Sequence, residues 1–166
     1  QVYKSIAFSD FQQRLPELEM IKNTAMNELL SVKIPLAIIY SDYDTFNDNA
    51  KAGQLIIKNN NNQFERIQSE LDIFDHHEIL VGSALKPIQR GSEVIYNLSS
   101  DFFFNISEKS VTLIEIDFGD ENGFQLIELD QNYNVTYPNE GEKQISYRLT
   151  FDNGFEIESV SKLNVI

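Results

Sequence analysis

Apolar and polar residues alternate along much of the second half of the chain. Ile114, Ile116 and Phe118 share one side of an extended segment, and the acidic residues between them share the other. We predict seven strands on this pattern: residues 79–85, 93–98, 111–118, 124–129, 133–137, 144–151 and 155–165. Short strands at such regular intervals are typical of an antiparallel β-sandwich.

Turn residues separate these predicted strands. Residues 119–123 and 138–141 combine glycine with aspartate, asparagine or proline, which are the residues that tight turns favour. Residues 152–154, Asp-Asn-Gly, lie between two alternating runs and are the strongest hairpin signal in the chain.

The first 73 residues follow a different pattern. Apolar side chains at Leu18, Ile21, Ala25 and Leu29 recur at spacings of three and four, which predicts a helix over about residues 17–30. An apolar run then predicts a buried strand over about 34–41, and four asparagines at 59–62 predict an exposed loop. We therefore expect a helix-plus-strand extension over residues 1–73, followed by a mainly β sandwich domain over 74–166.

Phe102, Phe103 and Phe104 break the alternation. If all three lay in one strand, at least one ring would lie on its outer face. The N-terminal helix has an apolar stripe that also requires a cover, so we expect the helix to pack on this run. The alternative interpretation is an exposed patch that contacts a partner.

Charge and composition exclude several classes of function. The chain has 26 acidic and 13 basic residues, a net charge of −13, which disfavours binding to nucleic acid. It has no cysteine and no apolar run of the roughly 20 residues that span a bilayer, so we expect neither thiol chemistry nor membrane insertion. A start at Gln1 is typical of a mature exported chain, although a cloned fragment would begin in the same way. Because the last residues resemble the end of a strand, we expect the chain to be the front piece of a longer protein.

Three segments resemble the PKD family of immunoglobulin-like domains. They are Ile114-Glu-Ile-Asp-Phe-Gly-Asp120, Val135-Thr-Tyr-Pro-Asn-Glu-Gly-Glu142 and Tyr147-Arg-Leu-Thr-Phe-Asp-Asn-Gly154. The likeness covers about residues 92–166, with two departures: Ile116 stands where the family has tryptophan, and Glu121 where a second glycine is common. This variant is similar to divergent PKD-like modules of large secreted bacterial proteins, in which a strand like residues 34–40 and a step like Ser83-Ala-Leu-Lys86 come first.

The resemblance implies an immunoglobulin-like sandwich that is not an enzyme. It implies a module of an exported bacterial protein, extracellular or on the outer cell surface, used for adhesion, spacing or docking. Its partner would be a cell-surface protein or downstream domains of its own chain.

Candidate metal ligands are few. Asp117, Asp120 and Glu121 surround the turn after a predicted strand and are candidate calcium ligands, although aspartates at a turn also accept hydrogen bonds from its amides. His76 and His77 are adjacent, so on a strand they point to opposite faces and do not readily share an ion. Residues 42–48 begin like a calcium loop, but the glycine and glutamate that an EF-hand requires are missing. We expect no cofactor, and calcium at this turn is the alternative.

The sequence contains no catalytic motif for hydrolysis or phosphate binding, so we expect no enzyme within this chain. One alternative function is a carbohydrate-binding module, which requires exposed aromatic rings for a glycan to stack on. The candidate rings are Tyr40, Tyr43, Phe102, Tyr133 and Tyr137. Another alternative is an N-terminal accessory domain of a longer secreted enzyme.

Overall fold

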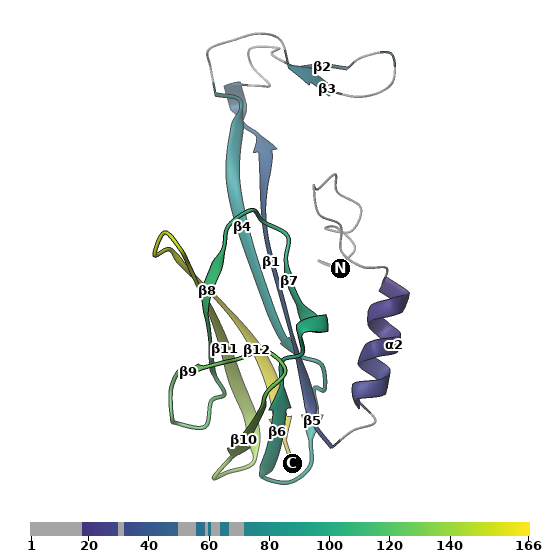
Figure 1. Ribbon diagram of the computed structural model, residues 1–166, viewed down its shortest axis with the longest axis vertical. Helices are drawn as coiled ribbons and strands as arrows, with labels where there is room; N and C mark the ends of the chain where they lie inside the picture. The colour runs from purple at the N-terminus through teal and green to yellow at the C-terminus, as the bar shows by residue number, and fades with distance from the viewer. Residues whose placement is uncertain (1–17, 30–31, 50–55, 59, 61–63, 67–71) are drawn as a thin grey trace. The chain divides into compact units, whose positions relative to one another are not determined.

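The computed structural model describes residues 18–29, 32–49, 56–58, 60, 64–66 and 72–166. These residues form two five-stranded mixed sheets packed as a β-sandwich, together with helix α2 (Leu18–Leu29) and a two-stranded sheet (Figure 1). The chain divides into two compact units, residues 1–41 with 80–166 and residues 42–79. The mainly β sandwich predicted from the sequence is confirmed.

The first sheet has the strand order β10-β6-β1-β4, with β7 pairing to β1. Its strands are β1 (Ile34–Phe46), β4 (Phe74–Ala84), β6 (Glu93–Asn97), β7 (Phe103–Asn105) and β10 (Asn132–Thr136). β1 pairs in parallel with β6 and then with β7, and β6 pairs antiparallel with β10. The strand expected in an N-terminal extension therefore lies inside the sandwich, which differs from the division made from the sequence.

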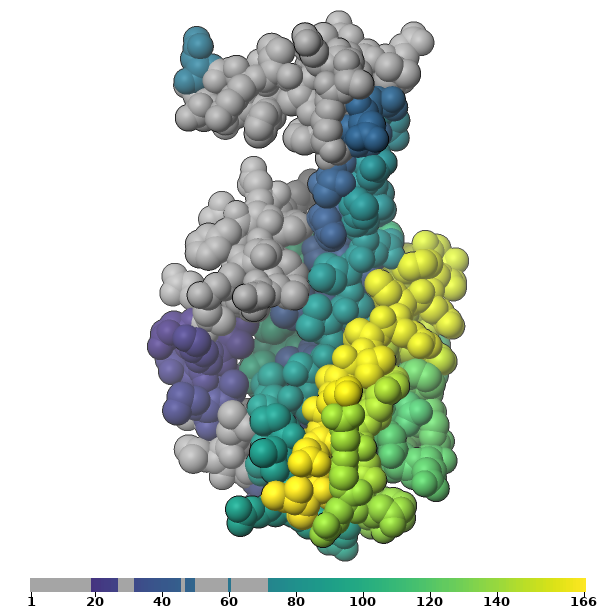
Figure 2. All heavy atoms as spheres, turned by 180° about the vertical axis from the view of Figure 1, so that it is seen from behind, coloured from purple at the N-terminus to yellow at the C-terminus, as the bar shows by residue number. Residues whose placement is uncertain are grey.

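The second sheet has the strand order β5-β12-β11-β8-β9. Its strands are β5 (Ile88–Gln89), β8 (Val111–Asp117), β9 (Gln125–Leu126), β11 (Gly141–Phe151) and β12 (Glu156–Val165). The Asp-Asn-Gly hairpin joins β11 to β12, which pair along ten positions and lie side by side in Figure 2. Both sheets are mixed rather than purely antiparallel, because β1 and β12 also take parallel partners.

Helix α2 and the strands β2 and β3 lie outside the two five-stranded sheets. Helix α2 (Leu18–Leu29) confirms the helix expected near residues 17–30. β2 (Ile56–Lys58) and β3 (Phe64–Arg66) form the two-stranded sheet on either side of the loop predicted at residues 59–62. Asn60 is the only one of the four asparagines that the structure describes, and it is exposed. Among the described residues, no helix is long and apolar enough to cross a membrane.

The core lies between the inner faces of the two sheets. Alternate residues of β1 and β11 meet there, and the Tyr40 and Phe151 rings are 4.6 Å apart between centroids. Gly82 of β4 is required for this packing, because a Cβ at that position would overlap the Tyr147 ring. Burying large apolar side chains contributes about 1.5–3 kcal/mol each, so this layer supplies most of the stabilisation.

Candidate functional site

The acidic turn that follows β8 is built by its own side chains. The Asp117 carboxylate accepts a hydrogen bond from the Gly119 amide at 2.8 Å. Asp120 accepts two hydrogen bonds from Asn122, one from its backbone amide and one from its side chain. Gly119 and Glu121 both have positive φ angles, of 71° and 72°. The two aspartates therefore hold the corner in shape.

These hydrogen bonds bear on the calcium hypothesis for Asp117, Asp120 and Glu121. Oxygen atoms that already accept hydrogen bonds from turn amides must give them up, at least in part, before they coordinate an ion. Among the described residues, no three histidine, aspartate or glutamate side chains are placed so that they could hold a metal ion. Calcium binding at this turn stays an alternative hypothesis, and turn-shaping by the two aspartates is the interpretation that we favour.

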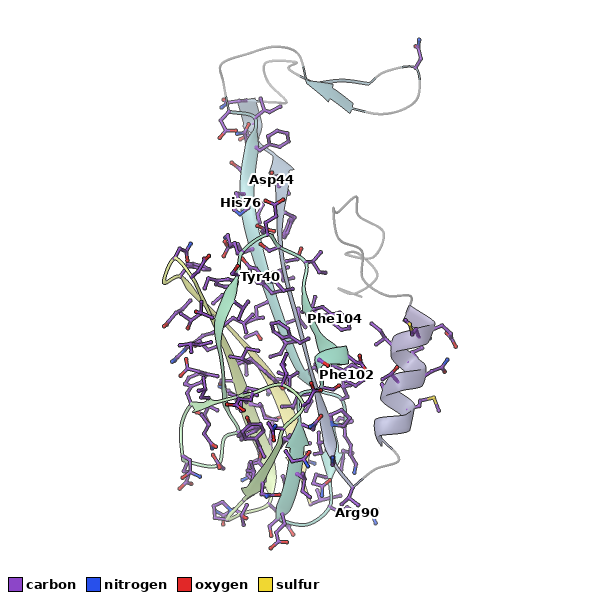
Figure 3. The ribbon with its side chains drawn as sticks, in the orientation of Figure 1. Tyr40, Asp44, His76, Arg90, Phe102 and Phe104 are labelled. Atoms are coloured by element: carbon purple, nitrogen blue, oxygen red, sulfur yellow. The ribbon has the colours of Figure 1, made fainter. Side chains whose placement is uncertain are left out.

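His76 lies among three carboxylates in the second compact unit. Its Nδ1 is 2.8 Å from an Asp44 carboxylate oxygen, and Figure 3 labels both residues. Its Nε2 is 3.9 Å from oxygens of Asp42 and of Glu78. The 2.8 Å contact with Asp44 is a hydrogen bond. The two 3.9 Å distances are longer than the roughly 3.4 Å that separates two ligands of one zinc ion, each about 2.1 Å from the metal.

His77 points to the other side of the strand, as its position next to His76 predicted. Its Nε2 is 2.8 Å from the Thr45 hydroxyl, and its ring stacks on Tyr43 with 5.3 Å between centroids. The two histidines therefore have different partners and do not meet at one ion. Neither set of partners could be predicted from the sequence, because the pairing of β1 with β4 decides them.

The Phe102–Phe104 run is divided between two kinds of structure. Phe102 ends a 3₁₀ helix, η1 (Ser100–Phe102), and is only 1% exposed, so it does not belong to an exposed patch. Phe103 pairs with the buried Ile38 and packs against the core, whereas Phe104 pairs with Ile39 on the opposite face. Phe102 therefore lies in a 3₁₀ turn rather than in a strand, and only Phe103 and Phe104 belong to the alternating strand β7.

Four of the five aromatic rings considered for glycan stacking are turned into the protein. Tyr40, Phe102 and Tyr137 are fully buried, and Tyr133 is half-buried with its hydroxyl accepting a hydrogen bond from the Glu128 amide. Tyr43 alone of the five is exposed, at 41%. These five side chains do not form one exposed aromatic platform.

A buried chain of hydroxyl groups links the two sheets, and sequence reasoning missed it. The Tyr137 hydroxyl donates to the Phe118 carbonyl at 2.7 Å and is 2.7 Å from the Tyr96 hydroxyl. Burial raises the pKa of Tyr137 to about 12, and burial also raises the pKa of Tyr96. The Tyr-Pro pair that follows a predicted strand was the available signal for this hydrogen bond. A tyrosine that is buried at such a place requires a hydrogen-bond partner for its hydroxyl.

Charged groups on the outer face of the second sheet form a smaller cluster around Arg148. Its guanidinium lies 3.7 Å over the Phe124 ring, and its Nε donates to Glu158 at 2.7 Å. The hydrogen bond to Glu158 raises the pKa of Arg148. Glu115 approaches the same guanidinium at 3.7 Å, so this cation is held on three sides.

No protein-family model matches the chain, and no curated protein matches it significantly. The assignment of a mainly β domain with two sheets therefore comes from the structure alone.

Proposed function

We propose that the chain is a non-catalytic, PKD-like module of an exported protein that serves adhesion, spacing or docking. The observation that carries this proposal is the turn after β8. There the Asp-Phe-Gly-Asp segment that resembles the family signature lies at the end of a strand in a two-sheet sandwich.

The individual residues of that segment have the structural roles that such a signature requires. Phe118 is fully buried and stacks on Tyr96 with 4.7 Å between ring centroids. Gly119 has a positive φ, and a Cβ there would overlap the backbone oxygen of Gln144. Aspartate, phenylalanine and glycine at these places therefore support a PKD-like fold, and hence a module of that kind.

The partner in this proposal is a protein on the cell surface or another part of the same polypeptide. A carbohydrate-binding module is a weaker alternative, because only Tyr43 of the five considered rings is exposed. The role of accessory domain beside an enzyme in a longer chain remains a further proposal.

Two measurements test this function. Antibodies against residues 72–166 should label intact producing cells without permeabilisation, and labelling that requires permeabilisation would contradict export. The 166-residue chain on beads should bind those cells in a saturable way that the free chain competes. Absence of surface binding together with binding on a glycan array, with or without calcium, would favour the carbohydrate alternative.

A further inference from the structure

Helix α2 has one half-buried stripe and one exposed side. Ile21, Thr24 and Ala25 are half-buried, at spacings of three and one, which places them on a single face of the helix. Met20 and Met26 lie off this stripe and are 56% and 65% exposed. A helix that stood free in solvent would not bury one face selectively.

The outer face of the first sheet carries a matching apolar surface. Ile39 and Phe104 are register partners on β1 and β7, so their side chains share a face, and both are half-buried. Ala37 lies two residues before Ile39 and is on the same face. Val81 alternates with the inward-facing Leu80 and Gly82 of β4, which places it on the outer face too. We call Ala37, Ile39, Val81 and Phe104 the outer patch.

The outer patch and α2 belong to the same compact unit. Pro35, which shares the face of Ala37 and Ile39 on β1, is buried, so this side of the sheet is not open along its whole length. Apolar side chains on the two surfaces gain by contact with each other, since each removes the other from water. The stripe of α2 and the outer patch could therefore cover each other within one chain.

We propose that α2 packs through Ile21, Thr24 and Ala25 on the outer patch and forms a releasable cover over it. None of the α2 side chains that the structure describes belongs to the buried core. The helix therefore releases without unfolding the sandwich, whose core lies on the opposite face of β1. Release exposes the outer patch to a partner. The inference goes beyond the docking role and does not depend on it, because it concerns contacts within one chain.

The absence of cysteine from the sequence allows a direct test. Single substitutions Ala25→Cys and Met26→Cys in the full chain place thiols on the covered and the exposed side of α2. Reaction with a thiol reagent, normalised to the unfolded protein, should be about tenfold or more slower for Ala25→Cys than for Met26→Cys. Ala84→Cys in the buried core should react more slowly still, because its exposure requires the sandwich itself to open.

A second substitution identifies the surface that α2 covers. Phe104→Ser should raise the reaction rate of the Ala25→Cys thiol toward that of Met26→Cys, while Phe104→Leu should leave it low. Val81→Thr, which is nearly isosteric, provides the same comparison if Phe104→Ser does not fold.

Three results would overturn the proposal. Equal rates for Ala25→Cys and Met26→Cys would mean that α2 is not covered. Equal rates for Ala25→Cys and Ala84→Cys would mean that the cover does not release separately from the sandwich. Protection of Ala25→Cys that is unchanged by both sheet substitutions would mean that α2 packs elsewhere.

Discussion

The hydroxyl groups of Tyr96 and Tyr137 lie 2.7 Å apart in the buried interior. Tyr96 is on β6, and Tyr137 directly follows β10, the neighbouring strand of the same sheet. Tyr137 donates its proton to the Phe118 carbonyl, so Tyr96 must donate to Tyr137. The phenol of Tyr137 thereby connects the first sheet to the turn after β8 in the second sheet.

Removing the Tyr137 hydroxyl should destabilise the sandwich more than removing that of Tyr96. Tyr137→Phe leaves both the Phe118 carbonyl and the Tyr96 hydroxyl without their partner, at a cost of about 1–3 kcal/mol in the free energy of unfolding. Tyr96→Phe removes only the donor to the Tyr137 hydroxyl and should lower the free energy of unfolding by about 0.5–1.5 kcal/mol. Urea unfolding of the two variants measures the difference, and a larger loss for Tyr96→Phe would contradict the assigned donor order.

Stability should fall as the pH rises above about 10. An unfolded tyrosine loses its proton near pH 10, whereas burial raises the pKa of Tyr137 to about 12 and also raises the pKa of Tyr96 and Tyr147. The unfolded chain therefore binds fewer protons than the folded chain in this window, and each retained proton lowers stability by up to about 1.4 kcal/mol per pH unit. The contribution of Tyr137 to the free energy of unfolding is complete below pH 10 and is lost as the pH rises to about 12.

Urea midpoints between pH 8 and pH 11 measure this loss. Tyr137→Phe should show a shallower fall than the parent chain, because one of the three titrating phenols is gone. A parent midpoint that stays constant from pH 9 to pH 11 would contradict the prediction.

Substitution of two glycines in the turn after β8 distinguishes the cost of a left-handed backbone from the cost of steric overlap. Gly119 and Gly123 both have a φ of 71°, but a Cβ would meet nothing within 4 Å at Gly123 and would overlap the Gln144 backbone oxygen at Gly119. Gly123→Ala should cost about 1–2 kcal/mol, the usual cost of a left-handed conformation for an alanine. Gly119→Ala should cost clearly more in the same urea experiment, because backbone cannot move aside as a side chain can. Equal costs would mean that the turn relaxes freely.

Substitutions of Asp117 distinguish a turn-shaping aspartate from a calcium ligand. Asp117→Asn retains an oxygen that can accept the Gly119 amide hydrogen bond, so its free energy of unfolding should change little. Asp117→Ala loses that hydrogen bond and should cost about 0.5–1.5 kcal/mol. Millimolar calcium should leave the melting temperature of the parent unchanged. A calcium-dependent rise that disappears in Asp117→Asn would instead assign the carboxylate to a calcium site.

Local patterns in the sequence determined the class of fold and most of its elements. The alternation at Ile114, Ile116 and Phe118 identified β8, and the corresponding alternation identified β11, because a half-buried strand requires a period of two. The stripe of α2 and the Asp-Asn-Gly hairpin were equally local signals. Residues 124–129 were predicted as one strand, but β9 contains only two residues. β9 is the edge strand of its sheet, so it pairs on one side alone.

Relationships between distant segments were decided only by the tertiary structure. The strand beginning at Ile34 joined the sandwich because β6 and β7 pair with it in parallel, and no local pattern encodes a parallel partner. The contact of His76 with Asp44, across 32 residues of chain, depends on the register between two strands. Phe102 became buried because a 3₁₀ turn, rather than a strand, holds it. Hydrophobic periodicity specifies which face of a segment is buried, but the competition among all segments for partners decides which surfaces meet.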